Sequence, residues 1–175
     1  MTKFSELHSP AESIMPWLEK KSIDPSRLEE TCASFRAQNL SIASLNGSFD
    51  LLHAGHLYMI HQASLQADCL IVALNTDASI KRYKGPERPI VCLRDRLSMM
   101  AALEFVDYVT WFDESDPCRI LSLIRPDVHV NGAEYGENCI EAETVKRCGG
   151  RLHLVKRIPG LATSEIIKTI RGSCD

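Results

Sequence analysis

Five short apolar runs, separated by stretches of helical character, are the feature that most constrains the fold of this chain. The runs cover residues 40–45, 69–74, 108–112, 128–130 and 152–155. The run at 69–74 is continuously apolar, as in strands that helices cover on both faces. Strands that alternate with helices predict a doubly wound, Rossmann-like α/β fold, a parallel five-stranded sheet with helices on both faces.

The connections between these strands indicate where a ligand would bind. Helices are expected at residues 54–66, 93–104, 117–124, 139–148 and 164–171. In an open parallel sheet, ligands bind beyond the carboxyl ends of the strands, where the strand order reverses. The segments after each strand are therefore the places to search, and all are expected to be loops: 46–55, 75–92, 113–116, 131–138 and 156–163.

Residues 1–38 differ from the rest of the chain. They are rich in charge and helix formers and carry no catalytic motif. Two short helices are expected, at 11–21 and 25–38, and the second has Asp24 as N-cap and Pro25 in its first turn. We expect a helical N-terminal extension, 1–38, followed by a catalytic domain, 39–175, and the extension packs either on that domain or on a partner.

Composition excludes several classes of protein. With 175 residues and 45% hydrophobic content, the chain forms one domain with a real core. A net charge of −3 argues against nucleic-acid binding through a general basic surface. The seven cysteines are odd in number and form no C-x-x-C pair, which favours reduced thiols over a disulfide framework or a metal site. We expect a cytoplasmic protein without a membrane partner, because no long apolar run or signal peptide is present.

The segment 46–56 joins the first strand to the next helix and carries the strongest functional signal. Gly47 permits a tight exit from the strand, and Gly55 leaves room for a ligand. His53 and His56 lie three residues apart at the helix N-terminus, which attracts anions. Either histidine alone is more often structural. Together, two imidazoles here can stabilise charge on an α-phosphate during in-line displacement, so we predict that both are catalytic.

Three further segments belong to the same rim. The expected loop after the second strand is basic, and it is either a solvated surface or, as we favour, a phosphate-binding loop that Arg94 and Arg96 extend. Asn131, Gly132 and Glu134 follow the fourth strand, where a nucleotide or sugar approaches. Thr163 or Ser164 is a natural N-cap of the last helix, whose N-terminus is also an anion site. The polar residues of the basic segment are Asn75, Asp77, Lys81, Arg82, Lys84 and Arg88.

The motif His53-Ala54-Gly55-His56 resembles the His-x-Gly-His motif of the cytidylyltransferase-like nucleotidyltransferase superfamily. Residues 162–167 resemble the family's second motif, with Ala162 where the family has serine. The resemblance implies that the two histidines bind a triphosphate and stabilise the transition state, and that Thr163 and Ser164 contact the β- and γ-phosphates. The preceding residues that match the family's strand-end segment are Asn46, Gly47, Ser48, Phe49 and Asp50.

Residues 75–89 are similar to the adenylyltransferase domain of ADP-heptose synthase. This resemblance implies ATP as substrate, D-glycero-β-D-manno-heptose 1-phosphate as the small phosphorylated acceptor, and Lys84 and Arg88 as phosphate contacts. We expect Lys84 to be catalytic, together with His53 and His56. Mg²⁺ is expected mainly on the triphosphate, without dedicated protein ligands. A homodimer is an expectation from the family. Asn131, Ala133 and Glu134 depart from the subgroup's Lys-Gly-Gly-Asp-Tyr and leave the acceptor open.

Three alternatives compete with this interpretation. A cytidylyltransferase that uses CTP and an alcohol phosphate would share the histidine motif. A regulatory module would bind a nucleotide without turnover, and the segment 1–38 gives it some weight. A dehydrogenase is disfavoured, because no Gly-x-Gly-x-x-Gly follows the first strand.

Overall fold

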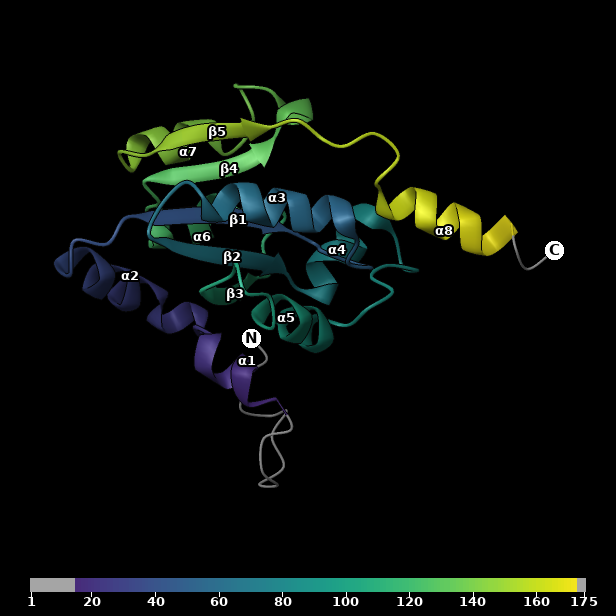
Figure 1. The fold of residues 1–175 in the computed structure, drawn as a ribbon, viewed down its shortest axis with the longest axis horizontal. Coiled ribbons are helices and arrows are strands. Elements are labelled where there is room, and N and C mark those ends of the chain that lie inside the picture. The colour runs from purple at the N-terminus through teal and green to yellow at the C-terminus, as the bar shows by residue number, and fades with distance from the viewer. Residues whose placement is uncertain (1–14, 173–175) are drawn as a thin grey trace.

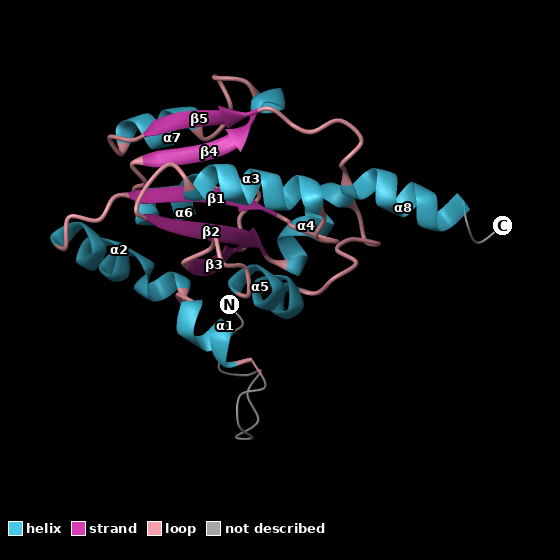
Figure 2. Cartoon of the chain, viewed as in Figure 1, coloured by secondary structure: helices cyan, strands magenta, loops and turns pink. Residues whose placement is uncertain are grey.

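A computed structural model describes residues 15–172, which form one five-stranded parallel sheet in the order β3-β2-β1-β4-β5 (Figures 1 and 2). The doubly wound fold predicted from the sequence is confirmed. Each predicted strand is present, with ends shifted by no more than two residues. The strands are β1 Ile42–Gly47, β2 Cys69–Asn75, β3 Tyr108–Phe112, β4 Val128–Gly132 and β5 Arg151–Val155.

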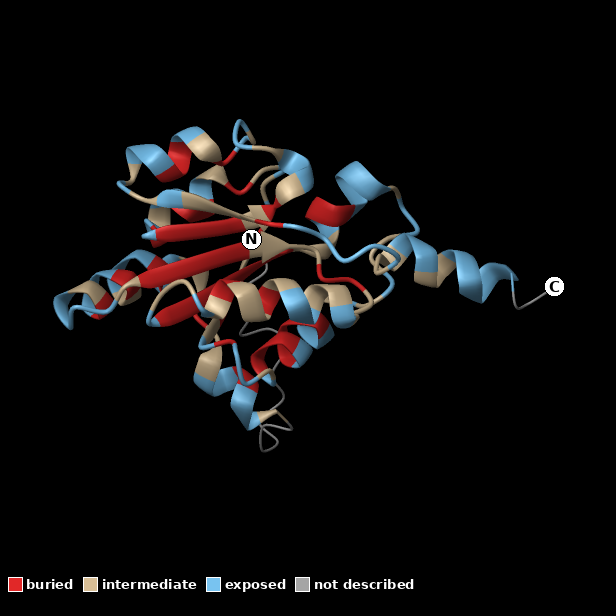
Figure 3. Ribbon diagram, turned by 45° about the horizontal axis from the view of Figure 1, so that its top comes forward, coloured by how far each residue is buried: buried red, intermediate tan, exposed pale blue. Residues whose placement is uncertain are grey.

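Helices cover both faces of the sheet, because successive strand residues point to opposite sides. In β2, Leu70, Val72 and Leu74 pack into one apolar cluster, while Cys69 and Ile71 pack into the other. The inner strands are largely buried, at the centre of the molecule, whereas the edge strand β5 is only partly buried (Figure 3). The first cluster takes in α1 Pro16–Lys21, α3 Ala54–Ser64 and α5 Leu93–Ala101, and the second takes in α2 Leu28–Ala37, α6 Cys118–Ile124 and α7 Ala142–Arg147.

The N-terminal helices belong to this core. Leu18 of α1 and Leu28 of α2 are buried, one on each face of the sheet. Between the two helices, the Ile23 amide donates to the Val109 carbonyl at 2.9 Å, beside strand β3. Asp24 caps a short 3₁₀ turn, Pro25–Arg27, as the sequence predicted for a helix start. Residues 11–14 of the first predicted helix lie outside the described residues.

The prediction of a loop over the whole of 75–92 is wrong, because helix α4 spans Asp77–Lys84. Thr76 is its N-cap and accepts from the Ser79 amide, and Asp77 lies in the favourable acidic first turn. Gly85 ends the helix with a φ of 91°, which glycine adopts without strain. Thr76 and Asp77 are sequence signals of a helix start, but the segment was interpreted as a loop because of its many basic residues. The predicted helix at 139–148 is also shorter than expected, since α7 begins at Ala142, after a 3₁₀ turn at Ala133–Tyr135.

The last helix, α8 (Thr163–Gly172), extends away from the sheet and has no buried residue (Figure 1). It begins at Thr163, so the residue before it is Ala162. The Thr163 hydroxyl donates to the Asp50 carbonyl at 3.0 Å, across 113 residues of sequence. The prediction that Thr163 or Ser164 caps this helix is therefore wrong. Thr163 instead connects the start of α8 to the segment after β1.

The chain carries neither disulfides nor membrane spans in its described part. Six cysteines between residues 15 and 172 are free thiols, and Cys174 lies outside that range. No helix within residues 15–172 combines the length and the apolar composition that crossing a bilayer requires.

Candidate active site

A cavity of about 630 Å³ lies at the carboxyl ends of the strands, where β1 and β4 are neighbours in the sheet. After β1 the chain passes to α3 on one face, and after β4 it passes to α7 on the other, which makes this the switch point of the fold. The volume suits a nucleotide-sized ligand. The predicted site residues that line the cavity are Asn46, Gly47, Ser48, Phe49, His53, Gly55, His56, Lys84, Arg88, Asn131, Gly132, Glu134, Thr163 and Ser164.

His53 and His56 form a stacked pair at the start of α3. Their ring centroids are 3.8 Å apart, with an angle of 23° between the planes. His53 is the N-cap, and its Nδ1 accepts from the Gly55 amide at 3.1 Å. The His56 amide donates to the His53 carbonyl at 2.9 Å. Two of the helix N–H groups expected to meet a phosphate, those of Gly55 and His56, are thus engaged within the protein.

The environment of both rings favours the neutral imidazole. Burial, followed by the positive charges around it, lowers the pKa of His56 to about 4. Burial and then the charge of Arg157 also lower the pKa of His53. Since His53 Nδ1 accepts a hydrogen bond, the proton of the neutral ring lies on Nε2 and can be donated to a ligand. His56 Nδ1 is buried without a hydrogen-bond partner among residues 15–172, an open position that a ligand group can fill.

Two glycines allow the backbone to come close to the site. A methyl group at Gly55 would lie 3.0 Å from the His53 ring and 3.0 Å from Leu161. A methyl group at Gly132 would overlap the Glu134 carboxylate. At both positions, the space that a side chain would need is occupied by other residues of the protein. Their predicted roles in ligand binding stay predictions.

Only two of the basic residues of 81–88 line the cavity. Lys84, the last residue of α4, donates from Nζ to the Ser48 hydroxyl at 2.9 Å, and burial lowers its pKa. Arg88 follows the helix. Arg82 instead pairs with Asp113 at 3.3 Å on the surface, and Lys81 is exposed. Because α4 is a helix, its successive side chains point in different directions, so Lys84 reaches the cavity while Lys81 and Arg82 lie at the surface. The interpretation of this segment as a loop did not predict this separation.

Asp50 holds the segment after β1 rather than lining the cavity. Its fully buried carboxylate pairs with Arg88 at 2.6 Å and accepts from the amides of Ile90 and Val91. Burial alone would raise the pKa of Asp50, but these backbone amides and the Arg88 guanidinium outweigh it and lower the pKa. The flanking Phe49 and Leu51 have φ values of 47° and 53°, a left-handed conformation that costs side-chain-bearing residues energy. The geometry favours a positioning role for Asp50.

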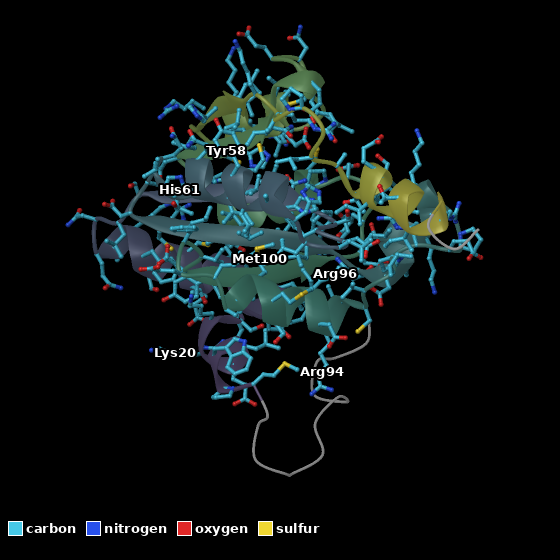
Figure 4. All side chains as sticks on the ribbon, turned by 45° about the vertical axis from the view of Figure 1, so that its right-hand side comes forward. Lys20, Tyr58, His61, Arg94, Arg96 and Met100 are labelled. Atoms are coloured by element: carbon cyan, nitrogen blue, oxygen red, sulfur yellow. The ribbon has the colours of Figure 1, made fainter. Side chains whose placement is uncertain are left out.

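Asp77 and Arg96 form a second support beneath the same segment. Arg96 is 1% exposed and donates to the carbonyls of Ser48 and Asn75 and, at 2.7 Å, to the Asp77 carboxylate. Figure 4 shows Arg96 within the molecule and Arg94 at its periphery, on the same helix. Neither arginine lines the cavity, so the predicted extension of a phosphate-binding surface to them is wrong. Asp77 likewise faces Arg96 rather than the cavity, a geometry that favours positioning.

Arg157 is a cavity residue that the sequence interpretation missed. It follows β5, its Nε lies 3.5 Å from the Glu134 carboxylate, and it lines the same cavity as the histidines. Its charge contributes to lowering the pKa of both His53 and His56. A cation just beyond the carboxyl end of the fifth strand was the available signal, since every strand of a parallel sheet ends at this rim.

The described residues provide no ready cage for a metal ion. Between residues 15 and 172, no three histidine, cysteine, aspartate or glutamate side chains gather in a way that would hold one. A magnesium ion at this site would therefore have to be held mainly by the phosphates of a ligand, an arrangement typical of that ion.

Comparison with known proteins places the chain among nucleotide-handling enzymes. Residues 44–172 match the family model described as cytidylyltransferase-like. The bifunctional protein HldE of Mesorhizobium japonicum is 39% identical over 151 residues, which are 86% of this chain and 30% of HldE. HldE of Wolinella succinogenes is 37% identical over 156 residues, 89% of this chain and 32% of that protein. The chain thus spans about a third of the length of these curated relatives.

Two solved structures resemble the chain in fold. A lipopolysaccharide core biosynthesis protein from Thermoplasma volcanium has a TM-score of 0.55 and 26% identity, and the match covers 68% of this chain and 97% of that one. Pantoate-beta-alanine ligase from Francisella tularensis, with a TM-score of 0.57 over 86% of this chain and 77% of that one, is only 13% identical. The second likeness is one of fold alone.

Proposed function

The chain belongs to the cytidylyltransferase-like family of nucleotidyltransferases, and from this premise we propose that it transfers AMP from ATP to a sugar 1-phosphate. The acceptor that we propose is D-glycero-β-D-manno-heptose 1-phosphate, and the products are an ADP-sugar and pyrophosphate. The observation that carries the proposal is the stacked pair His53–His56, which shares one cavity with Lys84, Arg88 and Arg157.

The proposed reaction is an in-line displacement at the α-phosphorus. An oxygen of the acceptor phosphate forms a bond to the α-phosphorus, and the bond from that phosphorus to the bridging oxygen of pyrophosphate breaks. The acceptor oxygen is already ionised, so no general base is required. Catalysis then consists of positioning and charge stabilisation. Neutral imidazoles suit this task, since each can donate a proton in a hydrogen bond as charge accumulates on the phosphate.

The other cavity residues are proposed to bind different phosphate groups of the triphosphate. Lys84 supplies a mobile point charge beside the segment after β1, and Arg88, fixed by Asp50, supplies a rigid one. Thr163 and Ser164 at the start of α8 bring hydroxyl groups and a helix N-terminus for the outer phosphates. Mg²⁺ would neutralise phosphate charge when bound, held chiefly by the triphosphate.

The choice of ATP and a heptose phosphate rests on similarity. Residues 75–89 resemble the adenylyltransferase subgroup, and relatives about 40% identical are bifunctional HldE proteins. Against this, Asn131, Ala133 and Glu134 differ from the subgroup where the cavity opens beyond β4. A cytidylyltransferase acting on an alcohol phosphate such as glycerol 3-phosphate is therefore the second candidate.

Pyrophosphate release tests the proposal directly. ATP and CTP are each combined with heptose 1-phosphate, other sugar 1-phosphates and glycerol 3-phosphate, and the rates are compared. We expect the highest kcat/KM with ATP and the heptose phosphate. A preference for CTP with glycerol 3-phosphate would establish the second candidate. Calorimetric binding of ATP without turnover on any acceptor would instead identify a regulatory nucleotide-binding module.

A further inference from the structure

Three carboxylates line the cavity, and two of them are engaged within the protein. Asp116 accepts from the Cys118 amide at 2.9 Å, at the start of α6. Glu134 is paired with Arg157. The third, Glu141, has no ion pair to any residue between 15 and 172. It is the carboxylate whose role the fold leaves unexplained.

Glu141 is buried, with 8% of its surface exposed, at the residue before α7. Its Oε2 lies 3.5 Å from the Asn131 amide nitrogen. Burial, and then the neighbouring Glu141 carboxylate, raise the pKa of the Cys139 thiol. The Asn131 side-chain oxygen accepts from the Gly132 amide at 2.9 Å, which leaves the nitrogen end toward Glu141. A single long amide contact leaves most of the four acceptor positions of this carboxylate open. At a cavity wall, these positions can accept hydrogen bonds from a ligand.

The negative charge of Glu141 determines which part of a substrate it can bind. A phosphate would be repelled, so the group must carry hydroxyl or amino hydrogens. The phosphate-binding residues His53, His56 and Lys84 belong to the segments after β1 and β2, whereas Glu141 follows β4. A nucleotide that lies across the switch point with its phosphates at α3 extends its sugar toward β4.

We propose that Glu141 recognises the hydroxyl groups of a substrate sugar and thereby determines sugar specificity, with the ribose of the nucleotide as the group it meets. Asn131 supports this role by donating from the same wall of the cavity. The inference rests on the proposed function, because it assumes that the phosphates lie at the histidines. It adds a residue that lies outside the histidine motif and outside the segment 131–135.

Calorimetry on the full chain tests the inference without requiring turnover. The dissociation constants of ATP, 2′-deoxy-ATP and 3′-deoxy-ATP are measured for wild type, Glu141→Gln and Glu143→Gln. Glu143 is the matched control, because it is an exposed carboxylate on the same helix. Hydrogen bonds to a charged group are strong, so wild type and the control should bind ATP about tenfold more tightly than at least one deoxy analogue. In Glu141→Gln this ratio should fall below about threefold.

Acceptor kinetics distinguish the two possible sugars. If the deoxy ratio stays unchanged while Glu141→Gln raises the KM of the best acceptor at least tenfold, the hydroxyl groups recognised are those of the acceptor. If neither quantity changes, the inference is wrong. Should Glu141→Gln not fold, Glu141→Asp retracts the carboxylate by one methylene and is judged by the same ratio. Absence of turnover in wild type would refute the proposed function, and the calorimetric ratio would still decide the role of Glu141.

Discussion

The two sides of the cavity are built in different ways. On the β1 side, the eleven contiguous residues 46–56 supply the histidines, and long-range bonds from Arg88, Arg96 and Thr163 hold that segment in place. On the β4 side, Asn131 and Glu134 lie together, but Glu141 and Arg157 come from separate stretches of the chain. The histidine pair therefore belongs to one continuous segment, whereas the polar groups of the β4 side are dispersed along the chain.

The difference extends to how firmly each side is held. Phe49 and Leu51 keep left-handed conformations that an isolated peptide would avoid, and the buried Asp50 between them accepts from two amides and an arginine. The β4 side has two long contacts, Glu134–Arg157 and Asn131–Glu141, each of 3.5 Å. We infer that the β1 side is preorganised and that a ligand completes the β4 side.

The largest expected effect is on the rate when the β1 side loses a donor. His56→Ala should lower kcat by roughly a hundredfold to a thousandfold, as loss of one transition-state donor does in other enzymes. The measurement is pyrophosphate release at saturating ATP and acceptor. His61→Ala is the control, since His61 lies on the same helix and packs against Phe105 with ring centroids 4.9 Å apart (Figure 4). A folded His56→Ala enzyme as fast as this control would contradict the assignment of catalysis to the β1 side.

The second expected effect is on stability, and it compares the loss of a buried ion pair with the loss of an exposed one. Asp50→Asn removes the charge that Arg88 faces and should cost about 3 kcal/mol of unfolding free energy. Asp113→Asn, which removes the exposed partner of Arg82, should cost less than about 1 kcal/mol. Urea denaturation of both variants at neutral pH provides the comparison. Equal losses would show that Asp50 does not support the segment after β1.

The same contrast explains what the sequence could predict. The five strands and the segment 46–56 are local patterns, so apolar periodicity and the spacing of His53 and His56 were sufficient to find them. Arg157 had a positional signal, because it directly follows the fifth strand, but Glu141 could not be assigned to the site, since only the packing after β4 brings it to the cavity. Arg96 is the opposite case, a residue that the sequence assigned to the binding surface and that lies outside the cavity. In the sequence it belongs to a basic surface, but its hydrogen bonds reach back to Ser48 and Asn75 and bury it.

The third prediction concerns the contact that joins the two sides beneath the cavity. His129 of β4 lies opposite Ser44 of β1, and its Nδ1 is 2.7 Å from the Ser44 hydroxyl. Burial lowers the pKa of His129 to about 4, below the ordinary value of 6.5. Between pH 6.5 and 4, the His129 ring is therefore protonated in the unfolded chain but not in the folded chain. The free energy of unfolding falls as the pH falls through this window. Between pH 6.5 and 5, His129 should account for about 2 kcal/mol.

Urea denaturation at several pH values between 5 and 7.5 measures this loss. His129→Gln should flatten the acid side of the stability profile, although His56, with a pKa also lowered to about 4, keeps part of the slope. If wild type and His129→Gln lose the same free energy between pH 6.5 and 5, then His129 is not held neutral between the strands.

The smallest effect should fall on binding and arise from the β4 side. Arg157→Ala removes a cation from the cavity, and the KM for ATP should rise about tenfold, the usual scale for one charge-assisted hydrogen bond. Its kcat should change little, because the histidines and their supports stay in place. Arg119→Ala is the control, since Arg119 pairs with Glu114 at the surface and lies outside the cavity. A fall in kcat as large as that of His56→Ala would mean that Arg157 acts on the transition state, and that catalysis is shared by both sides of the switch point.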